Sequence, residues 1–252
     1  MARDDETLPP GSAAALPAVV LAFVILWLLL DRGASGLGSF RGEAGIVVCV
    51  VVLAAAVVAE VLLTGRSPVQ ALAALGLRPP IGRALIWTIV VMVALLGFYP
   101  AFGFLTGAPV DIAPGWYLLI PGLFAQGGIA EETIFRGFLF RHFREGRPFW
   151  RAAWLAAVPF VAVHLLLFLS LDLAVALASV LVAVSLSFPL AWLFERSGNS
   201  IWPPAIVHTV VQGSIKLIEP DPNSFLALAI AWMLLSAVVP WVFFLLREGR
   251  ST

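Results

Sequence analysis

Three apolar stretches of this sequence each contain polar side chains of the kinds that carry out acid–base chemistry. The first, residues 131–136, reads EETIFR; the second ends at His164; the third contains His208 and Gln212. A charged side chain at the centre of a membrane costs at least about 2.5 kcal/mol. Polar residues retained in such stretches therefore indicate a site that uses them.

The spacing within the first stretch separates its two carboxylates. Glu132 and Arg136 are four residues apart, so on a helix they share a face, and we expect a structural ion pair between them. Glu131 is rotated by about 100° from Glu132 on the same helix. We therefore expect Glu131 to lie apart from that pair, where a buried carboxylate suits a general base acting on water.

The two histidines and Gln212 supply the other groups that hydrolysis requires. His164 is a candidate to orient the water or to shuttle its proton. His208 and Gln212 are four residues apart and can donate hydrogen bonds to the oxyanion of a tetrahedral intermediate. At about 1.5 Å per residue, Glu131, His164 and His208 lie roughly 15, 20 and 14 Å from the inner ends of their stretches. This shared depth favours one catalytic site built from three helices.

Each polar residue taken alone also has a structural explanation. A single histidine on an apolar helix is more often a hydrogen-bonded core residue than a catalytic one. We expect Lys216 to snorkel or to be paired locally near the outer end of its stretch. His142 lies beside several arginines and is expected to be solvated, and Glu60 is expected to be structural.

Composition indicates a polytopic membrane protein. Of the 252 residues, 61% are hydrophobic and 12% are charged, and the mean hydropathy is +1.01. A soluble domain has about 25% charged residues. The formal net charge is zero, and we expect no nucleic-acid partner. The single cysteine, Cys49, excludes an intramolecular disulfide and a cysteine-based metal cluster.

Eight apolar runs are each long enough to cross roughly 30 Å of hydrocarbon. They lie at about residues 14–30, 45–63, 84–106, 114–140, 152–170, 173–194, 200–218 and 224–246. The predicted fold class is therefore all-α, a polytopic membrane protein with about eight transmembrane helices. Ser67-Pro68 predicts a short amphipathic helix that ends at Gly76 and lies in the membrane interface.

The arginines predict how the chain is oriented. If the amino terminus is cytoplasmic, eleven arginines lie on the inner side and two, Arg32 and Arg41, on the outer side. By the positive-inside rule, both termini are then cytoplasmic. We expect a multi-pass protein of the cell (inner) membrane, in contact with the lipid bilayer.

The three polar stretches resemble the motifs of the CPBP intramembrane proteases, also called the Abi or CAAX-protease and bacteriocin-processing family. That family has Glu-Glu-x-x-x-Arg, then Phe-x-x-x-His, then His-x-x-x-Asn or Asp. Here the motifs read EETIFR at 131–136, FVAVH at 160–164 and HTVVQ at 208–212, and LGLRPP at 75–80 resembles an inner-loop stretch of the family. The resemblance covers roughly residues 66–218.

The resemblance implies an eight-helix endopeptidase that faces the cytoplasm and hydrolyses a peptide bond of a membrane-associated substrate, as a CAAX prenyl protease does. It implies that Glu131 and His164 activate water and that His208 and Gln212 form the oxyanion hole. The expected partner is a peptide or a lipid-anchored protein, with no soluble cofactor. The expected organisation is a tail at 1–13, one transmembrane protease domain at 14–246 with its motif-bearing core at about 114–218, and a tail at 247–252, both tails being cytoplasmic.

Two features leave the chemistry open at this point. Gln212 stands where the family has Asn or Asp, so its amide is one methylene further from the backbone. Family members are described both as metalloproteases and as glutamic proteases. A divalent metal such as zinc would be held by Glu131, His164 and His208. We favour the reading without a metal, since the HExxH pattern is absent.

Two other classes of function share these features. A binding or immunity module of the same fold would keep the motifs and sequester a peptide or a membrane protein without cleaving it. A proton-coupled transporter also uses buried Glu and His residues. No inverted repeat with broken helices is evident in the sequence, which disfavours the transporter.

Overall fold

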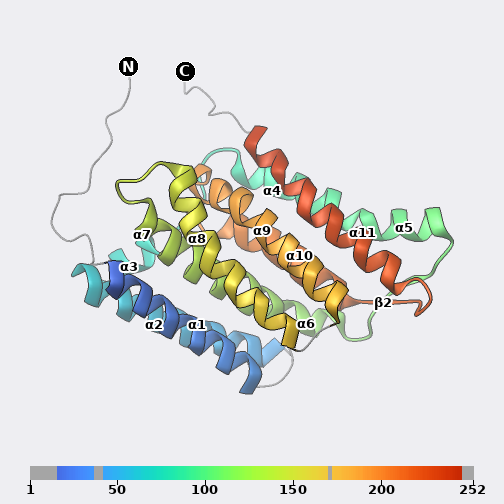
Figure 1. Ribbon diagram of the computed structural model, residues 1–252, viewed down its shortest axis with the longest axis horizontal. Helices are drawn as coiled ribbons and strands as arrows, with labels where there is room; N and C mark the ends of the chain where they lie inside the picture. Colours follow the sequence, from blue (N-terminus) through green and yellow to red (C-terminus); the bar gives the residue numbers. More distant parts are fainter. Residues whose placement is uncertain (1–15, 37–41, 170–171, 246–252) are drawn as a thin grey trace.

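The computed structural model describes residues 16–36, 42–169 and 172–245, and the two predicted tails lie outside the described residues. Each of the eight predicted runs coincides with a helical segment where it is described. The all-α fold class is therefore confirmed, and the chain is a multi-pass membrane protein (Figure 1).

Six helical segments of the described residues are long and apolar enough to cross a membrane. They are α1 (Leu16–Gly36), α2 (Gly42–Thr64), α4 with α5 (Ala84–Leu96 and Phe98–Thr106), α8 with η3 (Phe149–His164 and Leu165–Leu169), α9 (Leu173–Arg196) and α11 with η5 (Phe225–Val238 and Val239–Leu245). The predicted number of about eight spans is approximate, because the two remaining runs do not meet this description.

The two remaining runs are the ones that carry the first and third polar motifs. Residues 116–144 form a succession of helical pieces: α6 (Trp116–Leu123), the π-helices η1 (Phe124–Ala130) and η2 (Thr133–Phe140), and α7 (Arg141–Arg144). The other run is the short α10 (Trp202–Gly213), which continues as the 3-10 turn η4 (Ser214–Leu217). Irregular helices at membrane depth are tolerated where they are buried in protein.

Helix α10 lies at the centre of the arrangement. It contacts η1 on one side and α4 and α9 on the other, while α9 also packs on α8 and α11. Helices α1 and α2 lie side by side at the edge of the molecule, and α2 covers α6 and η1 (Figure 1). The helix with the third motif is therefore enclosed by the helices that carry the other two.

Two apolar clusters form the core. One joins α1, α2, η2 and α8 around residues such as Phe23, Phe135 and Phe160. The other joins α4, α10 and α11 around residues such as Leu95 and Trp232. Helix α9 contributes to both clusters, so the polar motifs lie where the clusters meet.

The short helix α3 (Pro68–Ala74) forms where the sequence predicts it. Ser67 caps it in a reciprocal capping box with Gln70, and Gly76 follows the helix with φ +84°. Leu75 is fully buried. A Cβ atom on Gly137 would lie 2.1 Å from the Leu75 carbonyl oxygen, so only glycine lets η2 approach α3 this closely.

A two-stranded ladder joins two connections that the sequence places on one side of the membrane. β1 (Val110–Ile112) pairs antiparallel with β2 (Ile218–Pro220), and Asp111 lies opposite Glu219. The Pro and Gly residues around these segments predicted plain loops, and the pairing was not predicted.

A buried charged cluster ties α2 to α7. The Glu60 carboxylate, which is fully buried, accepts hydrogen bonds from Arg66 and, at 2.6 Å, from Arg141. His142 Nε2 lies 3.0 Å from Glu60 Oε2, and His142 is buried. The expectation that His142 is solvated is therefore wrong, because a buried carboxylate needs surrounding donors to offset its loss of water.

Candidate active site

The helix that carries the two carboxylates is wound as a π-helix on both sides of them. η1 ends at Ala130 and η2 begins at Thr133, so Glu131 and Glu132 lie between two π-helical pieces. π-helical winding closes i to i+5 hydrogen bonds and is frequent at functional sites. The sequence analysis assumed ordinary α-helical geometry here.

Glu132 binds two cationic or donor groups with one oxygen. Its Oε1 accepts a hydrogen bond from the Arg136 guanidinium at 2.8 Å, within the same helix. The same oxygen lies 2.6 Å from Nδ1 of His208, which donates to it from α10. Glu132 is fully buried, and its Oε2 has no hydrogen-bond partner among the described residues. Glu132 therefore links the first motif to the third.

Glu131 lies apart from Arg136 and faces α10. Gln212 Nε2 donates to Glu131 Oε1 at 3.3 Å, and His208 Nε2 lies 3.6 Å from Glu131 Oε2. The longer side chain of Gln212 thus reaches the carboxylate. Both carboxylates meet the imidazole of His208, one at each ring nitrogen.

Two glycines let α10 approach the carboxylates. A Cβ atom on Gly127 would lie 2.1 Å from Gln212 Oε1. A Cβ atom on Gly128 would lie 2.4 Å from the Thr209 hydroxyl and 3.0 Å from the Ala205 carbonyl oxygen. Both distances are shorter than any contact a side chain tolerates, so the bare backbone at 127 and 128 is what brings the first and third motifs together.

His164 is held by its own helix. Its Nδ1 lies 2.7 Å from the Phe160 carbonyl oxygen, which can only accept, so Nδ1 carries the proton. In the neutral ring, Nε2 is then an acceptor. The Phe160 ring packs between this histidine and the rest of the site, 4.7 Å from the His164 ring and 6.1 Å from the His208 ring. The structure gives no direct contact between His164 and either carboxylate.

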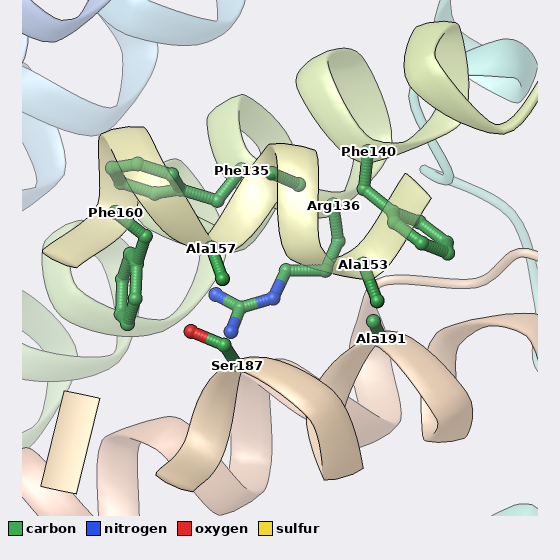
Figure 2. A pocket seen from close by; sticks show the side chains of 9 residues that line it. Phe135, Arg136, Phe140, Ala153, Ala157, Phe160, Ser187 and Ala191 are labelled. Atoms are coloured by element: carbon green, nitrogen blue, oxygen red, sulfur yellow. The ribbon is translucent and has the colours of Figure 1, made fainter. Parts of the chain in front are cut away.

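The Arg136 guanidinium lies over the Phe160 ring, 4.7 Å from its centroid, and it projects toward Ser187 of α9 (Figure 2). Small side chains such as Ala153 and Ala157 leave a cavity of about 10 Å³ beside it. That is about the space of one water molecule. The guanidinium is thereby held by Glu132, by an aromatic face and by room for a water.

A larger cavity adjoins the site between α8, α9, α10 and α11. Its volume is about 330 Å³, and His164, His208, Gln212 and Lys216 line it together with mainly apolar side chains. Lys216 also interacts electrostatically with Glu131. The sequence analysis placed Lys216 only near the outer end of its stretch. Its four-residue spacing from Gln212 and eight-residue spacing from His208 is the signal that puts these three on one face.

The alternative zinc ligands are not arranged as a metal site. Among the described residues, no group of three His, Cys, Asp or Glu side chains is placed to hold a metal ion. Glu131 and His208 approach each other, but Nδ1 of His164 is engaged by a backbone carbonyl. The set Glu131, His164 and His208 therefore does not fit a three-ligand zinc centre in this geometry.

Comparison with known proteins bears on the same residues. No curated protein and no solved structure matches the chain. A family model described as type II CAAX prenyl endopeptidase Rce1-like matches residues 112–214, which include all three motifs. This match confirms the resemblance to the CAAX-protease family, and it places the region that holds Glu131, His164, His208 and Gln212 in the Rce1-like family of membrane endopeptidases.

Proposed function

We propose that this protein hydrolyses a peptide bond of a membrane-anchored protein, using water activated by Glu131. The observation that carries the proposal is the position of Glu131, whose carboxylate lies beside two potential oxyanion donors, His208 and Gln212, at the wall of a cavity. The family match supports the same class of reaction.

In the proposed reaction, Glu131 removes a proton from a water molecule as the water oxygen attacks the carbonyl carbon of the substrate. The carbonyl oxygen becomes an oxyanion, which takes hydrogen bonds from Nε2 of Gln212 and Nε2 of His208. The proton held by Glu131 then passes to the leaving nitrogen as the C–N bond breaks. His164 offers Nε2 as an acceptor that orients the attacking water.

Glu132 acts through His208 in this scheme. Because its carboxylate accepts the Nδ1 proton, it holds the imidazole ring with Nε2 turned toward Glu131. When both ring nitrogens carry a proton, Nε2 can donate to the oxyanion. Arg136 balances the charge of Glu132, so the pair positions His208 without entering the reaction.

The scheme uses no metal ion, since the residues present do not form a three-ligand centre. We further propose that the described helices belong to a single transmembrane protease domain over residues 14–246. In this proposal, the domain lies in the cell (inner) membrane with both termini cytoplasmic. The eleven-to-two distribution of arginines supports this orientation.

The proposal is tested with purified protein in liposomes and a lipid-anchored peptide that carries a fluorophore and quencher across its cleavable region. We expect cleavage by the wild type and none by the matched Glu131→Ala protein. Binding of the peptide without cleavage would favour a sequestering module. Proton flux across the liposome that depends on added peptide, again without cleavage, would favour a transporter.

A further inference from the structure

The cavity beside the site has a reactive end and a cationic end. His208, Gln212 and Lys216 follow one another at four-residue intervals along α10 and η4, and all three line the cavity. Lys216 is the one Lys or Arg among the described residues that line it. The wall between the two ends is largely apolar and includes Val211 and Ile215.

A buried hydroxyl in the same cavity lacks a partner. Ser236 of α11 lines the cavity and is fully buried, and its Oγ has no hydrogen-bond partner among the described residues. Buried polar groups are almost always hydrogen-bonded. An occupant with backbone N–H and C=O groups would supply the missing bond, so this hydroxyl indicates that the cavity receives a polar ligand.

The length of the cavity wall matches a short peptide. His208 and Lys216 are eight residues apart, or about 12 Å along the helix axis. An extended chain spans about 3.3–3.6 Å per residue. A peptide whose reacting carbonyl lies beside His208 and Gln212 therefore reaches Lys216 with its third residue or so, and its intervening side chains lie against apolar surface.

We propose that this cavity binds the carboxyl-terminal segment of the substrate and that Lys216 pairs with the terminal α-carboxylate, about three residues beyond the cleaved bond. Ser236 hydrogen-bonds the backbone of the same segment. This inference rests on the proposed function for the direction of the peptide. It makes Lys216 a residue that determines specificity for a free carboxyl terminus, and it gives Glu131 a neighbouring charge that the substrate neutralises on binding.

The test measures binding to a protein that cannot cleave, so its outcome does not depend on hydrolysis. The Glu131→Gln protein in neutral-lipid nanodiscs is titrated with the tripeptide N-acetyl-Val-Val-Leu, either as the free acid or as the carboxyl-terminal amide. We expect the acid to bind at least about tenfold more tightly than the amide, the scale of one charge-assisted hydrogen bond. Adding Lys216→Gln should abolish this preference, whereas Lys216→Arg should retain it.

Two further variants keep the result interpretable. Arg32→Gln removes an exposed cation on α1 and should leave the preference for the acid unchanged. Ser236→Ala should weaken the acid and the amide alike. Equal binding of acid and amide to the Glu131→Gln protein, or loss of both in Lys216→Gln, would overturn the inference. Displacement of both peptides by phosphatidylglycerol would overturn it in favour of a lipid phosphate as the occupant. Selective binding of the acid together with no cleavage by the wild type would refute the proposed hydrolysis and leave the carboxylate site standing.

Discussion

Replacing Glu132 by Gln should destabilise the protein strongly, because one oxygen of this side chain serves two helices. In the structure, Glu132 Oε1 accepts from Arg136 at 2.8 Å and from His208 at 2.6 Å, and Glu132 has no exposed surface. The amide of Gln still offers an oxygen, but it carries no charge. The guanidinium of Arg136, only 3% exposed, would remain in the core without a neighbouring counter-ion bonded to it.

The size of the effect follows from that burial. Removing one partner of a buried ion pair costs about 3–5 kcal/mol. For a chain of this size, about 2–4 °C of melting temperature is lost per kcal/mol, so we expect a decrease of roughly 6–20 °C. The second replacement, Arg136→Met, tests the cause: the double variant Glu132→Gln/Arg136→Met should melt higher than Glu132→Gln alone, since no buried charge is then left unpaired.

The assay is thermal unfolding in detergent, followed by tryptophan fluorescence and by the fraction of monodisperse protein after heating. Wild type, both single variants and the double variant are compared in one buffer. Turnover should also fall in Glu132→Gln, because His208 loses the carboxylate that orients it. An unchanged melting temperature together with lost turnover would refute this reasoning and would show that Glu132, rather than Glu131, carries the chemistry.

Three other predictions concern the approach of α10, the charged cluster at α7 and the orientation. Gly127→Ala should lower turnover by about 10²-fold, the scale of a 1 Å misplacement, because the new methyl group would collide with the Gln212 side chain; turnover and folding are measured on the same preparation. Glu60→Gln should destabilise the protein by about 1–3 kcal/mol, measured by thermal unfolding, because its buried carboxylate holds three donor side chains. Cysteine substitutions at Arg147 and Asp111 should react with an impermeant maleimide from the inside and the outside of intact cells, respectively.

Each of these predictions has a matched control. Gly36→Ala places a methyl group in open space and should leave turnover unchanged. Glu43→Gln removes an exposed carboxylate from the same helix as Glu60 and should leave the melting temperature unchanged. The labelling uses a Cys49→Ala background, because this buried thiol is the chain's single cysteine. Wild-type turnover in Gly127→Ala, an unchanged melting temperature in Glu60→Gln, or labelling of position 147 from outside would contradict the corresponding prediction.

The helices could be predicted from the sequence because long apolar runs in a membrane have almost no alternative to a helix. The cap of α3 was equally visible, since Ser67, Pro68 and Gln70 are local signals. The π-helical winding around Glu131 was not visible, because nothing in the composition of residues 124–140 distinguishes i to i+5 from i to i+4 hydrogen bonding.

Contacts between distant residues were also beyond the sequence. The Glu132–His208 hydrogen bond joins residues 76 positions apart, and the Glu60–His142 contact joins residues 82 positions apart. Spacing along one helix predicted that Glu132 and Arg136 share a face. It could not show that His208 would take the same oxygen, nor that Lys216 would line a cavity with it.

The central claim, that Glu131 is the base for water, is tested most directly by the turnover of the Glu131→Gln protein on a cleaved substrate. Gln is nearly isosteric with Glu, and the carboxylate is bonded only weakly, at 3.3 Å from Gln212 Nε2. We expect an unchanged melting temperature and a decrease in hydrolysis of about 10²-fold or more, the usual scale for losing a positioned base. His164→Ala should lower turnover similarly, and the double variant should be little worse than either single one. Near-wild-type hydrolysis by folded Glu131→Gln protein would contradict the account and would make the two carboxylates structural.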